Sequence, residues 1–277
     1  MITEEYRVDG KVAIVTGAGR GIGKAIALTL AEAGADITVV ARTREQIEQT
    51  AEEIRQLGRK ALTLPIDVTQ EDQVKEVVEQ TLSQFGQIDI LVNNAGIAIR
   101  KPIVLAPGVE MPGWTGTGGS RDEQLTPQEW REIIDTNLTS AFLFAQAVGP
   151  HMMKQKKGKV INTSSTCADE GSPGISAYSV SKAGLSTFTR CLASEWGPFN
   201  INVNAIAPGM IRTEMIAHYL KDSKARETIL GKIPLGRVAE PRDVALLVLF
   251  LAAEASDYVT GQILTIDGGA MGRGIGI

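Results

Sequence analysis

Short apolar runs alternate with helix-length segments along this chain, and this alternation constrains the fold more than any other feature of the sequence. The runs, many of them rich in β-branched residues, span 12–15, 37–40, 88–92, 159–162, 201–206 and 263–266. Strands separated by helical segments form βαβ units and pair into a parallel sheet. Because the runs are almost continuously apolar, helices are expected to cover both faces of that sheet.

The segments between the runs carry helix signals. The Ala- and Leu-rich stretch 24–33 and the charged stretch 44–57 each end before a glycine, which is a favourable residue just beyond a helix. Residues 126–129 (Thr-Pro-Gln-Glu) combine an N-cap threonine, a proline in the first turn and a glutamate that completes a capping box. The chain is therefore expected to form an α/β fold.

Composition and charge narrow the class of protein. A chain of 277 residues can bury a large core, and no repeat or linker divides it, so residues 1–277 are expected to form a single domain. With 28 Lys and Arg against 32 Asp and Glu, the net charge of −4 argues against a nucleic-acid partner. Cys167, Cys191, His151 and His218 lack the spacing of metal ligands, so no metal site is predicted.

Nothing in the sequence predicts a membrane partner or an export signal. The first ten residues, MITEEYRVDG, are acidic and polar, unlike a signal or transit peptide. The longest apolar run, 244–253, has about half of the roughly 20 residues that a membrane span needs, and it predicts a buried helix instead. We therefore expect a cytoplasmic protein.

A glycine-rich turn, 16–23 (Thr-Gly-Ala-Gly-Arg-Gly-Ile-Gly), follows the first run and opens the first helix. Glycines let backbone N–H groups approach a pyrophosphate, which the positive end of a helix dipole also attracts. Glycine turns also occur for purely structural reasons. Between a strand and a helix, the turn predicts a dinucleotide site that includes Gly17, Gly19, Arg20, Gly21, Ile22 and Gly23.

The end of the second run bears on the choice of dinucleotide. A free ribose 2′-hydroxyl favours a carboxylate there, whereas a 2′-phosphate needs cations. The run ends Val40-Ala41-Arg42, without a carboxylate, and both Arg20 and Arg42 could point toward the ribose. We therefore predict NADP(H) in preference to NAD(H). The alternative is that both arginines are solvated surface charges.

Tyr178 and Lys182 are spaced at i and i+4, so on a helix their side chains share one face. A nearby ammonium favours the phenolate and would lower the pKa of the tyrosine from about 10. Such a tyrosine can exchange a proton with an alcohol or carbonyl oxygen. Chance also produces this spacing often, so its weight depends on the surrounding motifs.

Those motifs occur in one order along nearly the whole chain. They are the turn at 16–23, Asp67-Val68, Asn93-Asn94-Ala95-Gly96, Asp135-Thr136-Asn137-Leu138, Ser164-Ser165, Tyr178 with Lys182, Pro208-Gly209 with Thr213, and Ile266-Asp267-Gly268-Gly269. In this set and order the sequence resembles the short-chain dehydrogenase/reductase family, and within it the 3-oxoacyl-acyl-carrier-protein reductases. The resemblance implies a Rossmann-type, doubly wound parallel sheet of about seven strands.

The resemblance also implies roles for individual residues. Tyr178 would be the general acid/base, Lys182 would tune it and hold a ribose, Ser165 would bind the reacting oxygen, and Asn137 would anchor a water in a proton relay. The cofactor would also contact Asp67, Val68, Asn94, Ala95, Gly96, Pro208, Gly209, Ile211 and Thr213. From the residues alone, Asn137 could be a plain helix residue, Ser164 could replace Ser165, and Asp67 could be only a helix cap.

One segment departs from the family's usual pattern, and a second resembles the part of the family that contacts the substrate. The connection after 88–92 is long, with an insertion at about 100–121 that could cap a pocket or be a tolerated surface loop. Residues 213–233 resemble the family's mobile substrate lid, and Cys167, Met210 and Met215 are expected at the pocket edge.

These apolar edge residues favour reduction of a ketone, such as a 3-oxoacyl thioester or another β-keto compound. Interconversion of a sugar or polyol is the alternative, because specificity in the family resides in the lid. A non-catalytic NADP(H)-sensing regulator is a third reading, which predicts loss of Tyr178, Lys182 or Ser165.

The resemblance further implies a homotetramer, with 244–253 and 262–266 as candidate interface segments.

Overall fold

Seven parallel strands form one sheet in the structure, a computed structural model that describes residues 3–105, 123–217 and 221–272. Their order across the sheet is β3-β2-β1-β4-β5-β6-β7, so the winding direction reverses between β1 and β4. The predicted Rossmann-type α/β class is confirmed. The strands are β1 (Val12–Thr16), β2 (Asp36–Ala41), β3 (Ala61–Pro65), β4 (Ile90–Asn93), β5 (Gly158–Thr163), β6 (Ile201–Pro208) and β7 (Ile263–Ile266).

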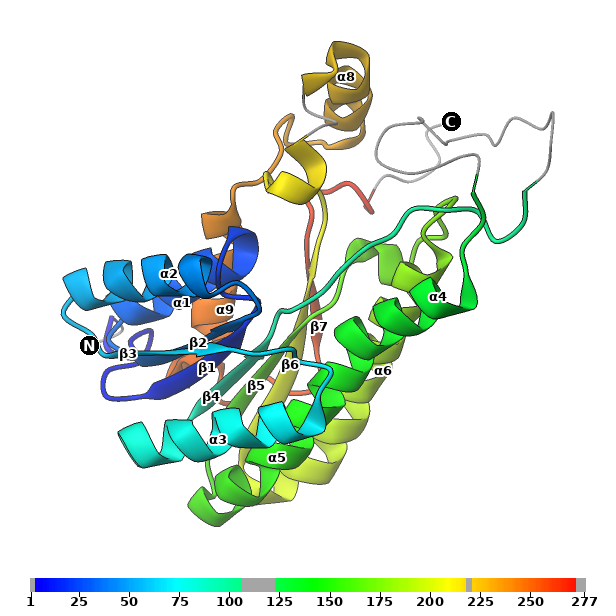
Figure 1. The fold of residues 1–277 in the computed structure, drawn as a ribbon. Coiled ribbons are helices and arrows are strands. Elements are labelled where there is room, and N and C mark those ends of the chain that lie inside the picture. The colour runs from blue at the N-terminus through cyan, green and yellow to red at the C-terminus, as the bar shows by residue number, and fades with distance from the viewer. Residues whose placement is uncertain (1–2, 106–122, 218–220, 273–277) are drawn as a thin grey trace.

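Helices cover both faces of the sheet (Figure 1). On one face lie α1 (Gly21–Glu32), α2 (Arg44–Gln56) and α9 (Pro241–Ala252); on the other lie α3 (Glu71–Phe85), α5 (Ser140–Gln155) and α6 (Ser176–Trp196). A continuous helical segment joins α4 (Pro127–Ile134) through the π-helical turn η1 (Asp135–Thr139) to α5, and α8 (Ser223–Lys232) stands above the sheet. Short 3₁₀ turns are η2 (Thr166–Ala168), η3 (Gly197–Phe199), η4 (Glu214–Ile216) and η5 (Glu254–Ser256).

Successive strand residues supply two hydrophobic clusters, one on each face. Val15 packs with residues of α1, α2 and α9, whereas its neighbour Ile14 packs with residues of α3, α5 and α6. The predicted buried helix 244–253 lies largely within α9, whose Val244, Val248 and Leu251 are completely buried. Within the described ranges, no helix is both long and apolar enough to cross a membrane.

The predicted strands and helices agree with the observed ones to within a few residues at most boundaries. The exception is β3, which produces no apolar run because four of its five residues are only partly buried at the sheet edge. The capping box at Thr126 and Glu129 forms as expected. Of the insertion expected at about 100–121, residues 106–121 lie outside the described residues, as do 218–220 of the expected lid.

The hydroxyl of Thr16 joins the carboxyl ends of β1 and β4. Its Oγ1 accepts hydrogen bonds from the backbone N–H groups of Asn94 and Ala95, at 2.9 and 3.0 Å, and donates to the carbonyl of Val92 at 3.3 Å. The Asn94 side chain returns a bond from Nδ2 to the Thr16 carbonyl at 3.0 Å. These bonds fix the two strand ends at which the winding reverses.

We expect Thr16→Val to lower the free energy of unfolding by about 1–3 kcal/mol, because it keeps the shape of the buried side chain but leaves two N–H groups without their acceptor. Thr16→Ser keeps the hydroxyl and should retain most of the stability. Urea denaturation of both variants tests this. Equal loss in the valine and serine variants would contradict the role of the hydroxyl.

Candidate functional site

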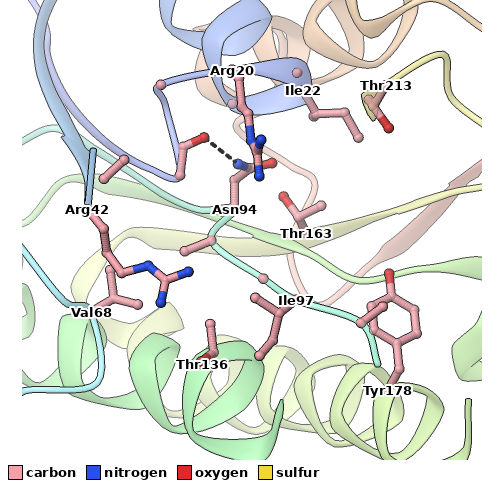
Figure 2. A pocket seen from close by; sticks show the side chains of 18 of the residues that line it. Arg20, Ile22, Arg42, Val68, Asn94, Ile97, Thr136, Thr163, Tyr178 and Thr213 are labelled. Atoms are coloured by element: carbon pink, nitrogen blue, oxygen red, sulfur yellow. Dashed lines mark hydrogen bonds between the residues drawn. The ribbon is translucent and has the colours of Figure 1, made fainter. Parts of the chain in front are cut away.

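A cavity of about 1000 Å³ opens at the carboxyl ends of the strands, beside the point where the winding reverses (Figure 2). Ligands of open α/β sheets bind at this position. The structure brings nearly every residue that the sequence singles out to its wall: Gly17, Gly19, Arg20, Gly21, Ile22, Gly23, Arg42, Asp67, Val68, Asn94, Ala95, Gly96, Ser165, Tyr178, Lys182, Pro208, Gly209, Ile211 and Thr213. Asn137 lies behind the wall.

The glycine turn forms the wall of the cavity at the N-terminus of α1. Gly17 and Gly21 have φ angles of 64° and 56°, in the left-handed region that favours glycine. A Cβ at Gly23 would lie 2.2 Å from the Gly17 carbonyl oxygen and 2.5 Å from Asn94 Nδ2. The turn therefore leaves no room for a side chain at Gly23, where the first turn of the helix meets β4.

The two arginines near the turn have different surroundings. Arg20, the N-cap residue of α1, forms an ion pair with Glu214 at the start of η4, so its charge is engaged across the cavity. Arg42 follows β2 and forms no ion pair with any described residue (Figure 2). Arg42 is thus the unpaired cation of the two. The expectation that both arginines could point toward a ribose is narrowed to Arg42.

Asp67 and Val68 line the cavity next to Arg42. Asp67 Oδ1 accepts hydrogen bonds from the backbone N–H and the hydroxyl of Thr69, at 3.0 and 2.9 Å, in the turn that precedes α3. The carboxylate therefore stabilises the local turn, while Val68, 6% exposed, offers an apolar surface. Asp67 is therefore not a helix cap, since the N-cap residue of α3 is Gln70, and it combines this role in the turn with a place in the cavity wall.

Tyr178 and Lys182 both face the cavity from α6, as their spacing predicts. Lys182 is 3% exposed, and its Nζ donates to the Thr163 carbonyl at 2.7 Å and lies 5.7 Å from the centre of the Tyr178 ring. Burial lowers the pKa of Lys182 to about 8. Burial also raises the pKa of Tyr178 to about 12, against a smaller lowering effect of the Ser165 hydroxyl.

The expectation of a lowered tyrosine pKa is therefore wrong for the protein in this form. The lysine ammonium is 5.7 Å from the ring centre and bonds a carbonyl, so it does not offset the burial of the phenol. At neutral pH Tyr178 carries its proton and can act as an acid.

The two serines after β5, Ser164 and Ser165, have different hydrogen-bond partners. Ser164 Oγ bonds the Lys182 carbonyl at 3.0 Å and the Ser186 hydroxyl at 2.7 Å, so it fastens α6 to the sheet. Ser165 Oγ accepts the Cys167 N–H at 3.2 Å and interacts with the Tyr178 hydroxyl. The geometry places Ser165, rather than Ser164, beside the tyrosine.

Asn137 lies in the π-helical turn between α4 and α5 and is 1% exposed. Its side-chain amide bonds both backbone groups of Ile97, from Ile97 N to Oδ1 at 2.8 Å and from Nδ2 to Ile97 O at 2.9 Å. A Cβ at Gly96 would lie 3.3 Å from Asn137 Oδ1 and 3.4 Å from Lys182 Nζ. Because Gly96 has no side chain, the side chains of Asn137 and Lys182 can both lie close to its Cα atom.

The segment after β6 closes the other end of the cavity. Gly209 bonds the Ile266 carbonyl, and Ile211 pairs with Ala239 as an isolated bridge. Thr213 occupies the N-cap position of η4 without a side-chain capping bond, and its methyl group lies 3.4 Å from where a Cβ would stand on Gly21. The start of the expected lid therefore contacts the glycine turn.

Some wall residues escape the sequence analysis. Thr163 has a buried hydroxyl with no hydrogen-bond partner among the described residues. One polar face of the α4–η1 helix also lines the cavity, at the spacing i, i+3, i+4, i+7 and i+8, a helical pattern that could have been found. This face comprises Gln128, Arg131, Glu132, Asp135 and Thr136. Of the residues expected at the pocket edge, Cys167 and Met210 are not among the lining residues, and the side chain of Met215 lies outside the described residues.

Described residues at the two ends of the expected insertion are tied together. Leu125 N–H bonds the Pro102 carbonyl at 2.7 Å, and Lys101 N–H bonds the Gly174 carbonyl at 2.9 Å. The Lys101 ammonium pairs with Glu123 and Glu129 at 2.6 and 2.7 Å. Both ends thus meet the body of the protein close to the start of α4.

A doubly wound sheet with a glycine turn and a Tyr–Lys pair in one cavity defines a Rossmann-type oxidoreductase. A family model described as enoyl-(acyl carrier protein) reductase matches residues 17–271. The chain belongs to the short-chain dehydrogenase/reductase family, and it is an oxidoreductase that acts on CH–OH or C=O groups.

The chain is similar to relatives with two different named activities. The chain is 40% identical to the 3-oxoacyl-[acyl-carrier-protein] reductase FabG of Thermotoga maritima, over 95% of this chain and 98% of the relative. It is 35% identical to the 2-dehydro-3-deoxy-D-gluconate 5-dehydrogenase of Escherichia coli, over 99% and 100%. The crystal structure of a gluconate 5-dehydrogenase from Burkholderia cenocepacia with NADP and tartrate has a TM-score of 0.87, 32% identity, and coverage of 99% and 100%.

The buried charge of Lys182 should cost stability. The pKa of Lys182 is about 8 in the folded protein against 10.5 for the ordinary group. The free energy of unfolding therefore decreases as the pH drops from 10.5 through 8, and at neutral pH this loss is about 3 kcal/mol. We expect Lys182→Met to be more stable than the wild type at pH 7, with an advantage that shrinks as the pH rises from 8 to 10. Chemical denaturation at both ends of this range measures the difference, and a constant difference would contradict the cause.

Proposed function

We propose that the protein interconverts a ketone and a secondary alcohol with NADP(H) as the hydride partner and Tyr178 as the general acid/base. The observation that carries this proposal is the convergence of Tyr178, Ser165 and Lys182 on the cavity that the glycine turn lines. A hydride and a proton can therefore be exchanged with the same substrate. An NADP(H)-sensing regulator would not need these three groups together.

The residues of the cavity fit a nicotinamide dinucleotide. The turn with Gly17, Gly21 and Gly23 presents backbone and a helix N-terminus to a pyrophosphate, with no side chain in the way. At the far end, the Thr163 hydroxyl is buried without a partner among the described residues, beside Lys182. When bound, the nicotinamide supplies or accepts the hydride.

The chain's own residues would handle the oxygen of the substrate. The Ser165 hydroxyl would donate to the carbonyl oxygen, and Tyr178, neutral at pH 7, would give it the proton in reduction and take it back in oxidation. The Lys182 ammonium would stabilise the resulting phenolate electrostatically. Asn137 would hold the Ile97 segment in place and support a water through which the proton is replaced.

Arg42 supports NADP(H) over NAD(H). It directly follows β2 on the cavity wall, and the strand ends at Ala41 without the carboxylate that a free 2′-hydroxyl favours. Its guanidinium is unpaired within the described ranges and suits bidentate phosphate binding. A related gluconate 5-dehydrogenase was crystallised with NADP.

We expect Ala41→Asp combined with Arg42→Leu to shift the ratio of kcat/KM for NADPH and NADH toward NADH by tenfold or more, because a carboxylate can bond a free 2′-hydroxyl and repels a phosphate. Steady-state kinetics with both cofactors measure the ratio. Arg20→Leu is the matched comparison, because Arg20 is already paired with Glu214. Unchanged NADPH selectivity in the double variant would overturn the assignment.

For the substrate we propose a 3-oxoacyl thioester or another β-keto compound, supported by the likeness to FabG. A sugar acid is the second candidate. The polar α4–η1 face of the cavity and the full-length likeness to 2-dehydro-3-deoxy-D-gluconate 5-dehydrogenase favour it.

We expect Tyr178→Phe to lower kcat by about a thousandfold or more while NADPH binding changes little, because only the proton donor is removed. The assay follows NADPH consumption with acetoacetyl-CoA and NADP⁺ reduction with D-gluconate, which also separates the two substrate classes. NADPH fluorescence measures binding. Full turnover by the phenylalanine variant would overturn the proposed acid/base role.

We further propose a cytoplasmic homotetramer. Two features support an interface at α9 and β7: the apolar side chain of Leu246 on α9 is 49% exposed, and β7 is the last strand of the sheet. Both cysteines are free thiols, which suits a reducing compartment. Light scattering after size-exclusion chromatography measures the assembly.

A further inference from the structure

Ser181, one residue before Lys182, has a hydroxyl that is bonded on both sides. Its Oγ accepts a hydrogen bond from Asn137 Nδ2 at 3.0 Å and donates to the Tyr178 carbonyl at 2.7 Å. Ser181 is completely buried and does not line the cavity. The sequence motif of Tyr178 and Lys182 assigns it no role.

The Asn137 amide depends on this hydroxyl. One of its two N–H bonds goes to the Ile97 carbonyl and the other to Ser181, and its oxygen is used by Ile97 N–H. At 1% exposure, no solvent can replace a lost partner. Without the Ser181 hydroxyl, the amide would have to rotate or leave a donor unpaired.

The position of Asn137 matters to the site through Gly96. The space beside Gly96 is bounded by Asn137 Oδ1 and by Lys182 Nζ, both within 3.4 Å of where a Cβ would stand. A shift of the amide therefore changes the surroundings of the buried ammonium. Ser181 connects this amide to the carbonyl of Tyr178, in the helical turn that carries both proposed catalytic side chains.

We propose that Ser181 is a positioning residue, whose hydroxyl holds the Asn137 amide against the turn of α6 that carries Tyr178 and Lys182. It acts through Asn137 and touches neither substrate nor cofactor. This inference rests on the proposed function for its kinetic consequences, but the placement of Asn137 beside Lys182 is a property of the free protein.

The same helix provides a matched control. Thr189 Oγ1 accepts from Asn162 Nδ2 at 2.9 Å and donates to the Leu185 carbonyl at 2.8 Å, the same amide–hydroxyl–carbonyl arrangement two turns farther along α6. Thr189 is also completely buried, and neither it nor Asn162 lines the cavity. Thr189→Val removes an equivalent hydroxyl at a distance from the proposed catalytic groups.

The first measurement uses the free protein. The pKa of Lys182 is followed by ¹³C NMR of the lysine side chains, with Lys182→Met for assignment. We expect Ser181→Ala to shift this pKa by half a unit or more, and Thr189→Val to leave it unchanged. An unchanged Lys182 pKa in Ser181→Ala would overturn the proposal, whether or not the protein reduces any tested substrate.

The second measurement is NADPH-dependent reduction of acetoacetyl-CoA from pH 6 to 10. We expect Ser181→Ala to lower kcat about tenfold and to displace its pH profile, with KM for NADPH changed less than twofold, and Thr189→Val to retain the wild-type profile. Ser181→Cys, with a weak donor of similar size, should recover part of kcat and serves if the alanine variant does not fold. Equal losses in Ser181→Ala and Thr189→Val would indicate general destabilisation and overturn the proposal.

A double variant tests whether Ser181 acts through Asn137. If it does, Ser181→Ala with Asn137→Ala should lose no more than about twofold in kcat beyond Asn137→Ala alone, because residues that act as a unit are not additive. Multiplicative losses would show that Ser181 acts independently of Asn137 and would overturn the proposal. Should the wild type turn over neither acetoacetyl-CoA nor D-gluconate, the proposed function fails and the Lys182 titration alone decides the role of Ser181.

Discussion

Buried amide and hydroxyl groups hold the strand ends and α6 in one arrangement, and the site depends on them. The Thr16 hydroxyl joins β1 to β4, and Asn93 Nδ2 bonds Asn162 Oδ1 between β4 and β5. Ser164 adds a bond from β5 to the Lys182 carbonyl. Hydrogen bonds are directional, so these contacts fix α6 in rotation and register more narrowly than apolar packing alone could.

That rigidity allows the site to contain a group that burial disfavours. Lys182 keeps its ammonium beside the Thr163 carbonyl with its pKa lowered to about 8, while Tyr178 keeps its proton to a pKa of about 12. Both shifts have burial as their largest cause. The lysine is therefore poised to respond to any new negative charge near the tyrosine, which is the change that proton donation to a substrate would create.

Much of the architecture follows from local sequence patterns. Apolar runs located six of the seven strands, and the glycine turn located the cavity wall, because strand burial and backbone freedom leave direct traces in residue type. The edge strand β3 left no such trace, since it buries little. The π-helical turn at Asn137 and the pairing of Arg20 with Glu214, 194 positions later, depend on tertiary contacts that no local pattern encodes. The predicted direction of the Tyr178 pKa shift was wrong for the same reason. The spacing of the two residues reveals that Tyr178 lies near Lys182, but it does not reveal how deeply the tyrosine is buried.

The bond between Leu125 N–H and the Pro102 carbonyl has a consequence for how this scaffold can vary. It closes the chain at the neck of the long connection after β4, and the Lys101 ion pairs with Glu123 and Glu129 reinforce the closure. The entropy cost of a longer or shorter segment grows only slowly with its length. Evolution or an engineer can therefore exchange the residues between these anchors while the sheet, the glycine turn and the Tyr178–Lys182 turn stay as they are.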